Sequence, residues 1–209
     1  MNWKDYFQMM IDWKKLPAYK AEPRIDSLIG YYLKPILEDY LKAGIEGIIP
    51  ELPIRLGTVR PEHEGTNYAD RSYKVDFFAI GEYHINYLIE FKTDSGSRRD
   101  NQDKYLIQAK SVSTEKLING IQQIAKVSTY KEKYNHLLNK LREYGFIDNR
   151  EHYTGKNQGL EIIYVQPSKK DKEENVIDFI WIADWLEKTY KNEIFESEFA
   201  RALRTWSKD

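Results

Sequence analysis

The chain has 209 residues and no cysteine, and its 32 lysines and arginines nearly balance its 33 aspartates and glutamates. This length favours a single domain with a sizeable core, and the lack of cysteine excludes disulfides, zinc-thiolate sites and cysteine nucleophiles. The net charge of −1 neither supports nor excludes nucleic-acid binding. Without a membrane-length apolar run or a signal-peptide pattern, we expect a cytoplasmic protein with no membrane partner.

The N-terminal part of the chain predicts two helices and an edge strand. Aromatic and aliphatic residues three and four apart predict a short amphipathic helix within residues 1–20, packed on the domain or on a partner. A longer helix begins near Glu22 and runs to about Lys42, and Pro35 inside it predicts a kink. Residues 48–56 predict a strand, whose two prolines favour an edge position.

Two segments rich in β-branched and aromatic residues, 73–80 and 87–92, predict the strands of a hairpin. Asp76 lies within the first segment, and Glu90-Phe91-Lys92 ends the second. Because side chains alternate along a strand, Glu90 and Lys92 point to the same face. The simplest alternative is that these two residues form a solvated ion pair on an exposed sheet face.

Helices dominate the remainder of the chain, with two more strands between them. A helix break is predicted near Ser128 and Thr129. In chain order, the predicted segments are a polar loop at 93–100, helices at 102–111 and 115–144, strands at 160–165 and 176–182, and helices at 185–190 and 194–206.

The three polar residues and the order of the elements resemble the PD-(D/E)xK nuclease superfamily, whose signature is an aspartate on one core strand and (D/E)xK on the next. Asp76 takes the position of the aspartate, and Glu90 and Lys92 supply the ExK. Val75 stands where a proline often precedes the aspartate. A second triplet of this kind, at residues 12–14, has no strand-like run before it.

The resemblance covers about residues 22–166 and implies an α/β fold with a restriction endonuclease-like αβββαβ core. That core is a mixed central sheet flanked by helices. The expected organisation is therefore a single domain over residues 1–209, with an N-terminal helical appendage at 1–20 and a C-terminal strand and helices at 176–209.

The resemblance also implies a metal-dependent nuclease, a hydrolase that cleaves phosphodiester bonds of DNA. Asp76, Glu90 and the backbone carbonyl of Phe91 would hold Mg²⁺ or Mn²⁺, since these ions prefer oxygen ligands. Lys92 would position the attacking water or stabilise developing negative charge.

Members of the superfamily often add a metal-site glutamate near the start of the first core helix. Glu22 matches that position and lies close to the apolar stripe of its helix, whereas Glu38 falls on nearly the opposite side. The alternative is that Glu22 is a helix-start charge stabilised by the helix dipole.

Supporting residues are expected on the helices after the ExK strand, where several members carry a glutamine followed by a tyrosine. Gln123 followed by Tyr130 is similar, and Gln102 with Tyr105 is a competing match. Basic residues also gather near the predicted site, namely Lys92, Arg98, Arg99, Lys104 and Lys110.

Other functions are less consistent with the sequence. The four histidines lack HExxH spacing, and neither a GxxxxGK[ST] phosphate loop nor a GxSxG elbow is present. The main alternative is a catalytically silent module of the same fold that binds nucleic acid or protein, and a glycosidase with paired carboxylates is more distant. The sequence leaves open DNA against RNA, endonuclease against exonuclease, and a homodimer.

Overall fold

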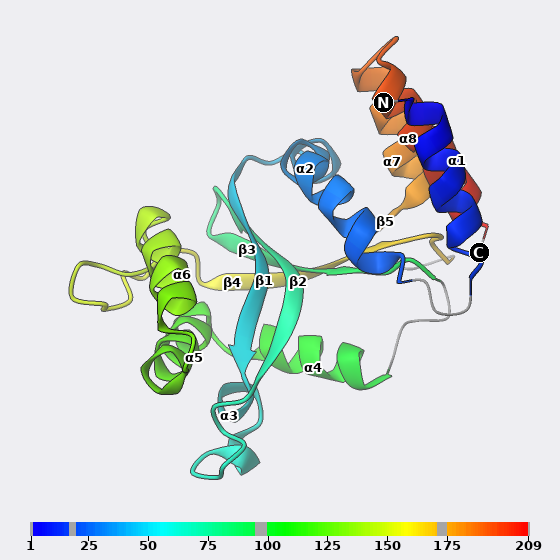
Figure 1. The fold of residues 1–209 in the computed structure, drawn as a ribbon. Coiled ribbons are helices and arrows are strands. Elements are labelled where there is room, and N and C mark those ends of the chain that lie inside the picture. The colour runs from blue at the N-terminus through cyan, green and yellow to red at the C-terminus, as the bar shows by residue number, and fades with distance from the viewer. Residues whose placement is uncertain (1, 17–19, 95–99, 171–174, 209) are drawn as a thin grey trace. The chain divides into compact units, whose positions relative to one another are not determined.

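The computed structural model describes residues 2–16, 20–94, 100–170 and 175–208 (Figure 1). Its elements follow the predicted order closely. They are α1 Trp3–Trp13, α2 Glu22–Leu41, β1 Ile45–Arg55, α3 Leu56–Val59, the 3-10 helix η1 Pro61–His63, β2 Ser72–Gly81, β3 Ile85–Phe91, α4 Asp100–Ser111, α5 Thr114–Val127, α6 Lys131–Glu143, β4 Gly159–Gln166, β5 Val176–Asp178, α7 Phe179–Thr189 and α8 Ile194–Trp206.

The strands form one mixed sheet in the order β1-β2-β3-β4-β5, flanked by helices, so the expected α/β class is confirmed. The β1–β2 and β2–β3 pairs are antiparallel, and the β4–β5 pair is parallel. The predicted edge position of β1, which carries Pro50 and Pro53, is also confirmed. None of the described helices is long and apolar enough to span a membrane.

The chain divides into two compact units. The first comprises residues 1–40, 90–99 and 163–209, and the second comprises residues 41–89 and 100–162. The first unit therefore holds α1, α7, α8, β5 and nearly all of α2, and the second holds β1, β2 and helices α3 to α6.

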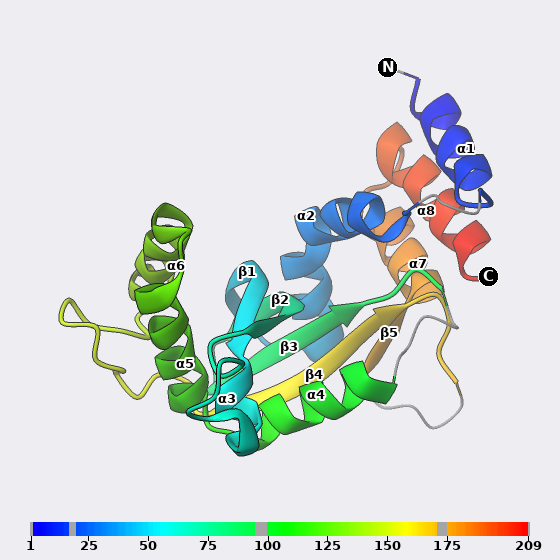
Figure 2. The same cartoon turned by 60° about the horizontal axis from the view of Figure 1, so that its bottom comes forward.

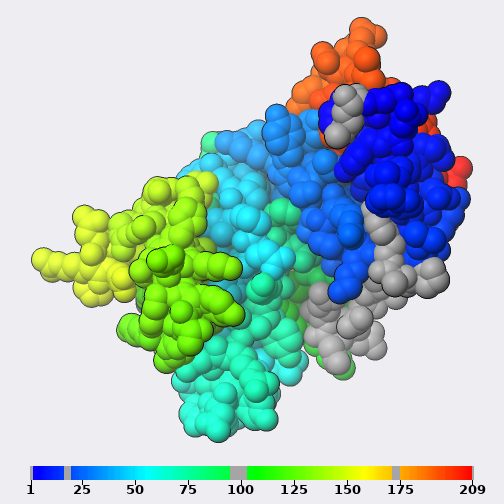
Figure 3. All heavy atoms as spheres, in the orientation of Figure 1, coloured from blue at the N-terminus to red at the C-terminus, as the bar shows by residue number. Residues whose placement is uncertain are grey.

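In the first unit, helix α1 packs against α8, as predicted for an amphipathic N-terminal helix (Figure 1). The Phe7 ring is fully buried and stacks on Phe199, with ring centroids 5.5 Å apart. Trp3 meets Phe195 edge to face at 4.8 Å. Atoms of α1 form part of the visible surface, so the helix is a covering layer of its unit (Figure 3).

Helix α2 begins at Glu22 and continues without a break through Pro35. Its apolar stripe is buried at Ile25, Ile29 and Ile36, and burial of this stripe stabilises the helix despite the backbone hydrogen bond that proline removes. Tyr32 on the same face donates a hydrogen bond to Glu196 at 2.7 Å. Burial, together with this carboxylate, raises the pKa of Tyr32 far above its usual range.

In the second unit, a buried arginine at the end of β1 organises the polar stretch that follows. Arg55 donates two hydrogen bonds to Glu64, at 2.5 and 3.1 Å, and one to Asp70 at 2.7 Å. The guanidinium is only 7% exposed, so these charge-assisted bonds offset its removal from water. The sequence predicts residues 57–71 as a polar, turn-forming stretch, and these bonds tie two of its acids to the end of β1.

The long helical segment predicted for residues 115–144 is two helices, with the break at the predicted place (Figure 2). Ser128 leaves the helical conformation with ψ of 141°, and its hydroxyl accepts a hydrogen bond from the Tyr130 amide at 3.1 Å. Helix α6 then packs beside α5.

The strand predicted at residues 176–182 is wrong beyond Asp178. The strand β5 ends at this residue, and the Asp178 carboxylate accepts a hydrogen bond from the Trp181 amide at 2.8 Å. This N-cap starts helix α7 at Phe179. The apolar residues that follow belong to the buried face of a helix, a distinction that a short apolar run does not make by itself.

A buried polar network joins the β2–β3 turn to the segment before β4. Asn157, 3% exposed, donates to the Gly81 carbonyl at 2.6 Å and to the Asn86 side chain at 3.1 Å. Asn86 in turn donates to the Asn157 carbonyl at 3.0 Å. Because these groups are removed from water, loss of one of their hydrogen bonds costs more free energy of unfolding than loss of an exposed hydrogen bond.

We predict that Asn157→Ala lowers the free energy of unfolding by about 2–4 kcal/mol, because it removes the donor to the Gly81 carbonyl and to the Asn86 side-chain oxygen, while the bond from Asn86 to the backbone carbonyl of residue 157 remains. Its φ of 48° adds a backbone cost for alanine. Asn192→Ala is the matched control, since Asn192 has a φ of 69° at an exposed position. Urea unfolding measures both variants, and equal losses would contradict a role for the network.

Candidate functional site

The carboxylate of Glu90 and the ammonium of Lys92 form a buried ion pair at the end of β3. Lys92 Nζ lies 2.5 Å from Glu90 Oε1, and the side chains of Lys92 and Glu90 are 5% and 2% exposed, respectively. The prediction that the two side chains share a face is confirmed. The alternative of a solvated surface pair is wrong, because both charges are removed from water.

The backbone of Glu90-Phe91-Lys92 is held by packing of the Phe91 ring and by a backbone hydrogen bond from Lys92. The Phe91 ring is fully buried and stacks on Phe179, with centroids 6.0 Å apart and ring planes at 27°. The Lys92 amide donates to the Val165 carbonyl at 2.8 Å. Phe91 therefore points into the core while Glu90 and Lys92 project from the opposite face, as alternation requires.

Asp76 lies in the middle of β2, in the second unit, and its side chain is half-buried. Its neighbours Val75 and Phe77 are buried and pair with Leu52 and Pro50 on β1. Glu90, Phe91 and Lys92 belong to the first unit. The predicted signature is thus divided, with the aspartate in the second unit and the ExK residues in the first.

Glu22, the further glutamate predicted for the metal site, lies at the start of α2. Glu22 is the first residue of α2, is half-buried, and belongs to the same unit as Glu90 and Lys92. Glu38 is half-buried as well and lies 4.0 Å from Lys34 in an ion pair. Burial therefore does not distinguish the two acids.

The two glutamine candidates gain less support. Gln123 is exposed on α5, whereas its neighbour Gln122 donates to the Glu151 carbonyl at 2.6 Å. Gln102 lies in α4, and its side chain is outside the described part of the structure. Arg98 and Arg99 also lie outside the described residues.

Within the described ranges, no three histidine, aspartate or glutamate side chains gather as a metal site of that size requires. The ligand set predicted from Asp76, Glu90 and Phe91 has only two carboxylate side chains, and its third donor is a backbone carbonyl, so it is not a cluster of that kind. Its donors are all oxygen atoms, which fit Mg²⁺ because this ion usually takes one or two carboxylates and keeps water ligands.

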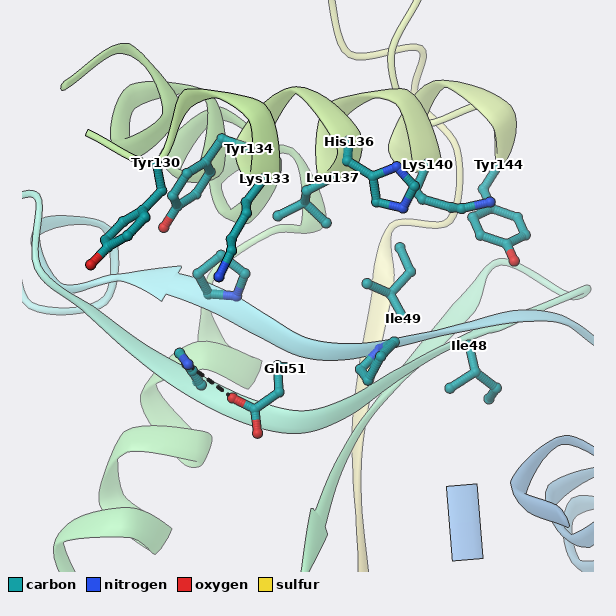
Figure 4. A pocket seen from close by; sticks show the side chains of 13 residues that line it. Ile48, Ile49, Glu51, Tyr130, Lys133, Tyr134, His136, Leu137, Lys140 and Tyr144 are labelled. Carbon is teal, nitrogen blue, oxygen red and sulfur yellow. Dashed lines mark ion pairs between the residues drawn. The ribbon is translucent and has the colours of Figure 1, made fainter. Parts of the chain in front are cut away.

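A groove of about 790 Å³ lies between β1 and α6 in the second unit (Figure 4). Its floor is apolar, with Ile49 and Pro53 from β1. The opposite wall, formed by α6 and its two flanking residues, carries aromatic and basic side chains, namely Tyr130, Lys133, Tyr134, His136, Lys140 and Tyr144, of which Lys133 points toward the strand in Figure 4. The recurring tyrosines and lysines of residues 130–144 are the sequence signal for this groove.

Two contacts fix the ends of α6 against the sheet. The Tyr134 hydroxyl hydrogen-bonds to Ser72 of β2, and burial raises the pKa of Tyr134. Tyr144 packs on Gly47 of β1, where a Cβ atom would lie 2.3 Å from the tyrosine ring. The lack of a side chain at Gly47 therefore lets the Tyr144 ring lie directly against β1.

No model of a protein family, no curated protein and no solved structure matches this chain. We therefore infer its function from the chemistry of its residues and from the order of its elements.

We predict that Lys92→Met lowers the free energy of unfolding by about 3–5 kcal/mol, because it leaves the Glu90 carboxylate buried without its partner. The double variant Glu90→Gln/Lys92→Met recovers most of this loss, since it removes both charges. Lys34→Met is the control, and loss of its exposed i,i+4 pair costs about 0.3–0.5 kcal/mol. A Lys92→Met loss no larger than the control in urea unfolding would contradict the buried pair.

Proposed function

We propose that this chain is a metal-dependent nuclease with a PD-(D/E)xK-type site, and that its substrate is DNA. The observation that carries the proposal is the buried Glu90–Lys92 pair, which ends a strand paired antiparallel with the strand that holds Asp76. The element order from α2 through β4 supports a restriction endonuclease-like core as part of the same proposal.

The strand register supports the third residue of the site. Phe77 of β2 pairs with Ile89 of β3, so Asp76 and Glu90 are the next residue on each strand. We propose that Asp76 and Glu90 use the same face of the two strands. Lys92 would take that face as well, because it lies two residues from Glu90.

Asp76, Glu90 and the Phe91 carbonyl would hold Mg²⁺ or Mn²⁺ in this arrangement, with Glu22 as a candidate fourth ligand. The bound ion would supply Lewis-acid stabilisation of the phosphate and a lower pKa for an attacking water. The chain's own contribution is to keep these donors in place on paired strands, so that little reorganisation is needed on substrate binding.

Lys92 would act on the same phosphate through its ammonium group. A buried ammonium interacts more strongly with a phosphate oxygen than an exposed one, because water screens it less. Glu90 holds this group at the end of β3 and so orients it. In the proposed reaction Lys92 stabilises the negative charge that develops on the phosphate, or orients the water that attacks it.

A catalytically silent module of the same fold is the second candidate, and one observation favours it. Glu90 and Lys92 already neutralise each other inside the protein, as the members of a purely structural pair do. The net charge of −1 is compatible with such a role. Metal-dependent cleavage separates the two candidates.

We expect the purified full-length chain to cleave DNA with Mg²⁺ or Mn²⁺ and to be inactive in EDTA. Asp76→Asn lowers the cleavage rate by at least about a hundredfold, the loss expected when a key electrostatic group of an active site is removed. Glu62→Gln is the control, because Glu62 is an exposed acid of the same unit. Inactivity of the wild type on single-stranded, double-stranded and branched DNA and on RNA would reject the nuclease.

The role of Glu22 is tested by a matched pair on one helix. We predict that Glu22→Gln raises the Mg²⁺ concentration needed for half-maximal cleavage, because it removes a carboxylate from the proposed ligand set. Glu38→Gln leaves that concentration unchanged. Equal Mg²⁺ dependence of the two variants would contradict a ligand role for Glu22 and indicate only a helix-start charge.

A further inference from the structure

We infer that the groove between β1 and α6 binds single-stranded nucleic acid and leads it toward Asp76. This inference deepens the proposed function, and it rests on that function only for the direction in which the strand runs. Binding in the groove itself requires neither a metal ion nor cleavage.

The groove combines the two features that single-stranded nucleic acid needs. Tyr130 offers an aromatic ring at the start of α6 on which a base can stack, and the rings of Tyr134 and Tyr144 line the same groove while they pack against the sheet (Figure 4). Tyr130 is 67% exposed, so its ring is open to a ligand. Lys133 lies over this ring at 5.5 Å, which places a cation beside a stacking surface.

The charge of the groove wall favours a polyanion. Lys74, Lys133 and Lys140 line it, and Glu51 is the single acid among the residues that line the groove, although Lys140 also lies 2.7 Å from Glu143. Glu51 is paired with Lys74 at 3.1 Å, with both side chains more than half exposed. Exposed pairs of this kind are weak, so a phosphate can replace the carboxylate at Lys74.

The groove is more suited to nucleic acid than to an extended peptide. A peptide would add as a strand to the edge of the sheet through a regular row of backbone hydrogen bonds. Edge strand β1 lacks such a row, because Pro50 and Pro53 have no amide hydrogen and Glu51 has a φ of 52°. Stacking on tyrosines requires no backbone row.

Strand alternation relates the groove to Asp76 within the second unit. Ser72 bonds to Tyr134 of α6, and Lys74 lines the groove, so this face of β2 is turned toward α6. Asp76 lies two residues beyond Lys74 and takes the same face. A strand bound along the groove would therefore reach the residue that the proposed metal site requires.

The test measures fluorescence anisotropy of a labelled 12-nucleotide oligo-dT with the full-length chain in EDTA. We expect the single strand to bind more tightly than a duplex of equal length or poly-glutamate. Tyr130→Ala and Lys133→Glu each weaken binding about tenfold, and Lys133→Glu also reduces its salt dependence. The controls Tyr83→Ala and Lys116→Glu, exposed residues of the same unit outside the groove, leave the affinity unchanged.

Wild-type affinity in both groove variants would overturn the inference, and so would binding of poly-glutamate in preference to the oligonucleotide. Failure of the proposed nuclease gives a different pattern. In that case no cleavage occurs with Mg²⁺ or Mn²⁺, but oligo-dT binding still depends on Tyr130 and Lys133. If instead cleavage occurs while binding is independent of these two residues, the nuclease stands and the groove inference fails.

Discussion

The removal of a carboxylate and an ammonium from water at the end of β3 is the constraint on which the proposed chemistry depends. Neither charge is stable alone in such a place, so Glu90 and Lys92 require each other. The stacked ring of Phe91 and the backbone bond from Lys92 to Val165 hold the segment between them. In the proposed site, the buried ammonium would interact more strongly with a phosphate than an exposed one, because water screens it less.

The second unit supplies a different kind of constraint. Arg55, bound to Glu64 and Asp70, orders the stretch after β1, and the tyrosines at positions 134 and 144 fix α6 over the sheet. These contacts leave a groove with stacking rings, cations and an apolar floor beside the face of β2 that carries Asp76. The groove proposed to bind nucleic acid therefore belongs to the second unit alone.

Much of this arrangement follows from local sequence patterns. The α2 stripe, the break at Ser128 and the Glu90–Lys92 face could be predicted because helix and strand periodicities are local. Burial of the Glu90–Lys92 pair could not, since burial is set by segments distant in the sequence, whereas strand periodicity gives only the face of a side chain. The strand at residues 176–182 was predicted too long because the Asp178 cap competes with an apolar run. The groove was missed because its two walls are far apart in the chain.

The central claim is that Asp76 and Glu90 share one divalent ion, and Mn²⁺ binding measured by calorimetry with the full-length chain tests it most directly. The account predicts one Mn²⁺ site in the wild type that disappears in both Asp76→Asn and Glu90→Gln and persists in Glu62→Gln. Thermal unfolding of each variant establishes that it is folded under the conditions of the titration. Absence of Mn²⁺ binding to the wild type, or a site that a folded Asp76→Asn variant retains, would contradict the account.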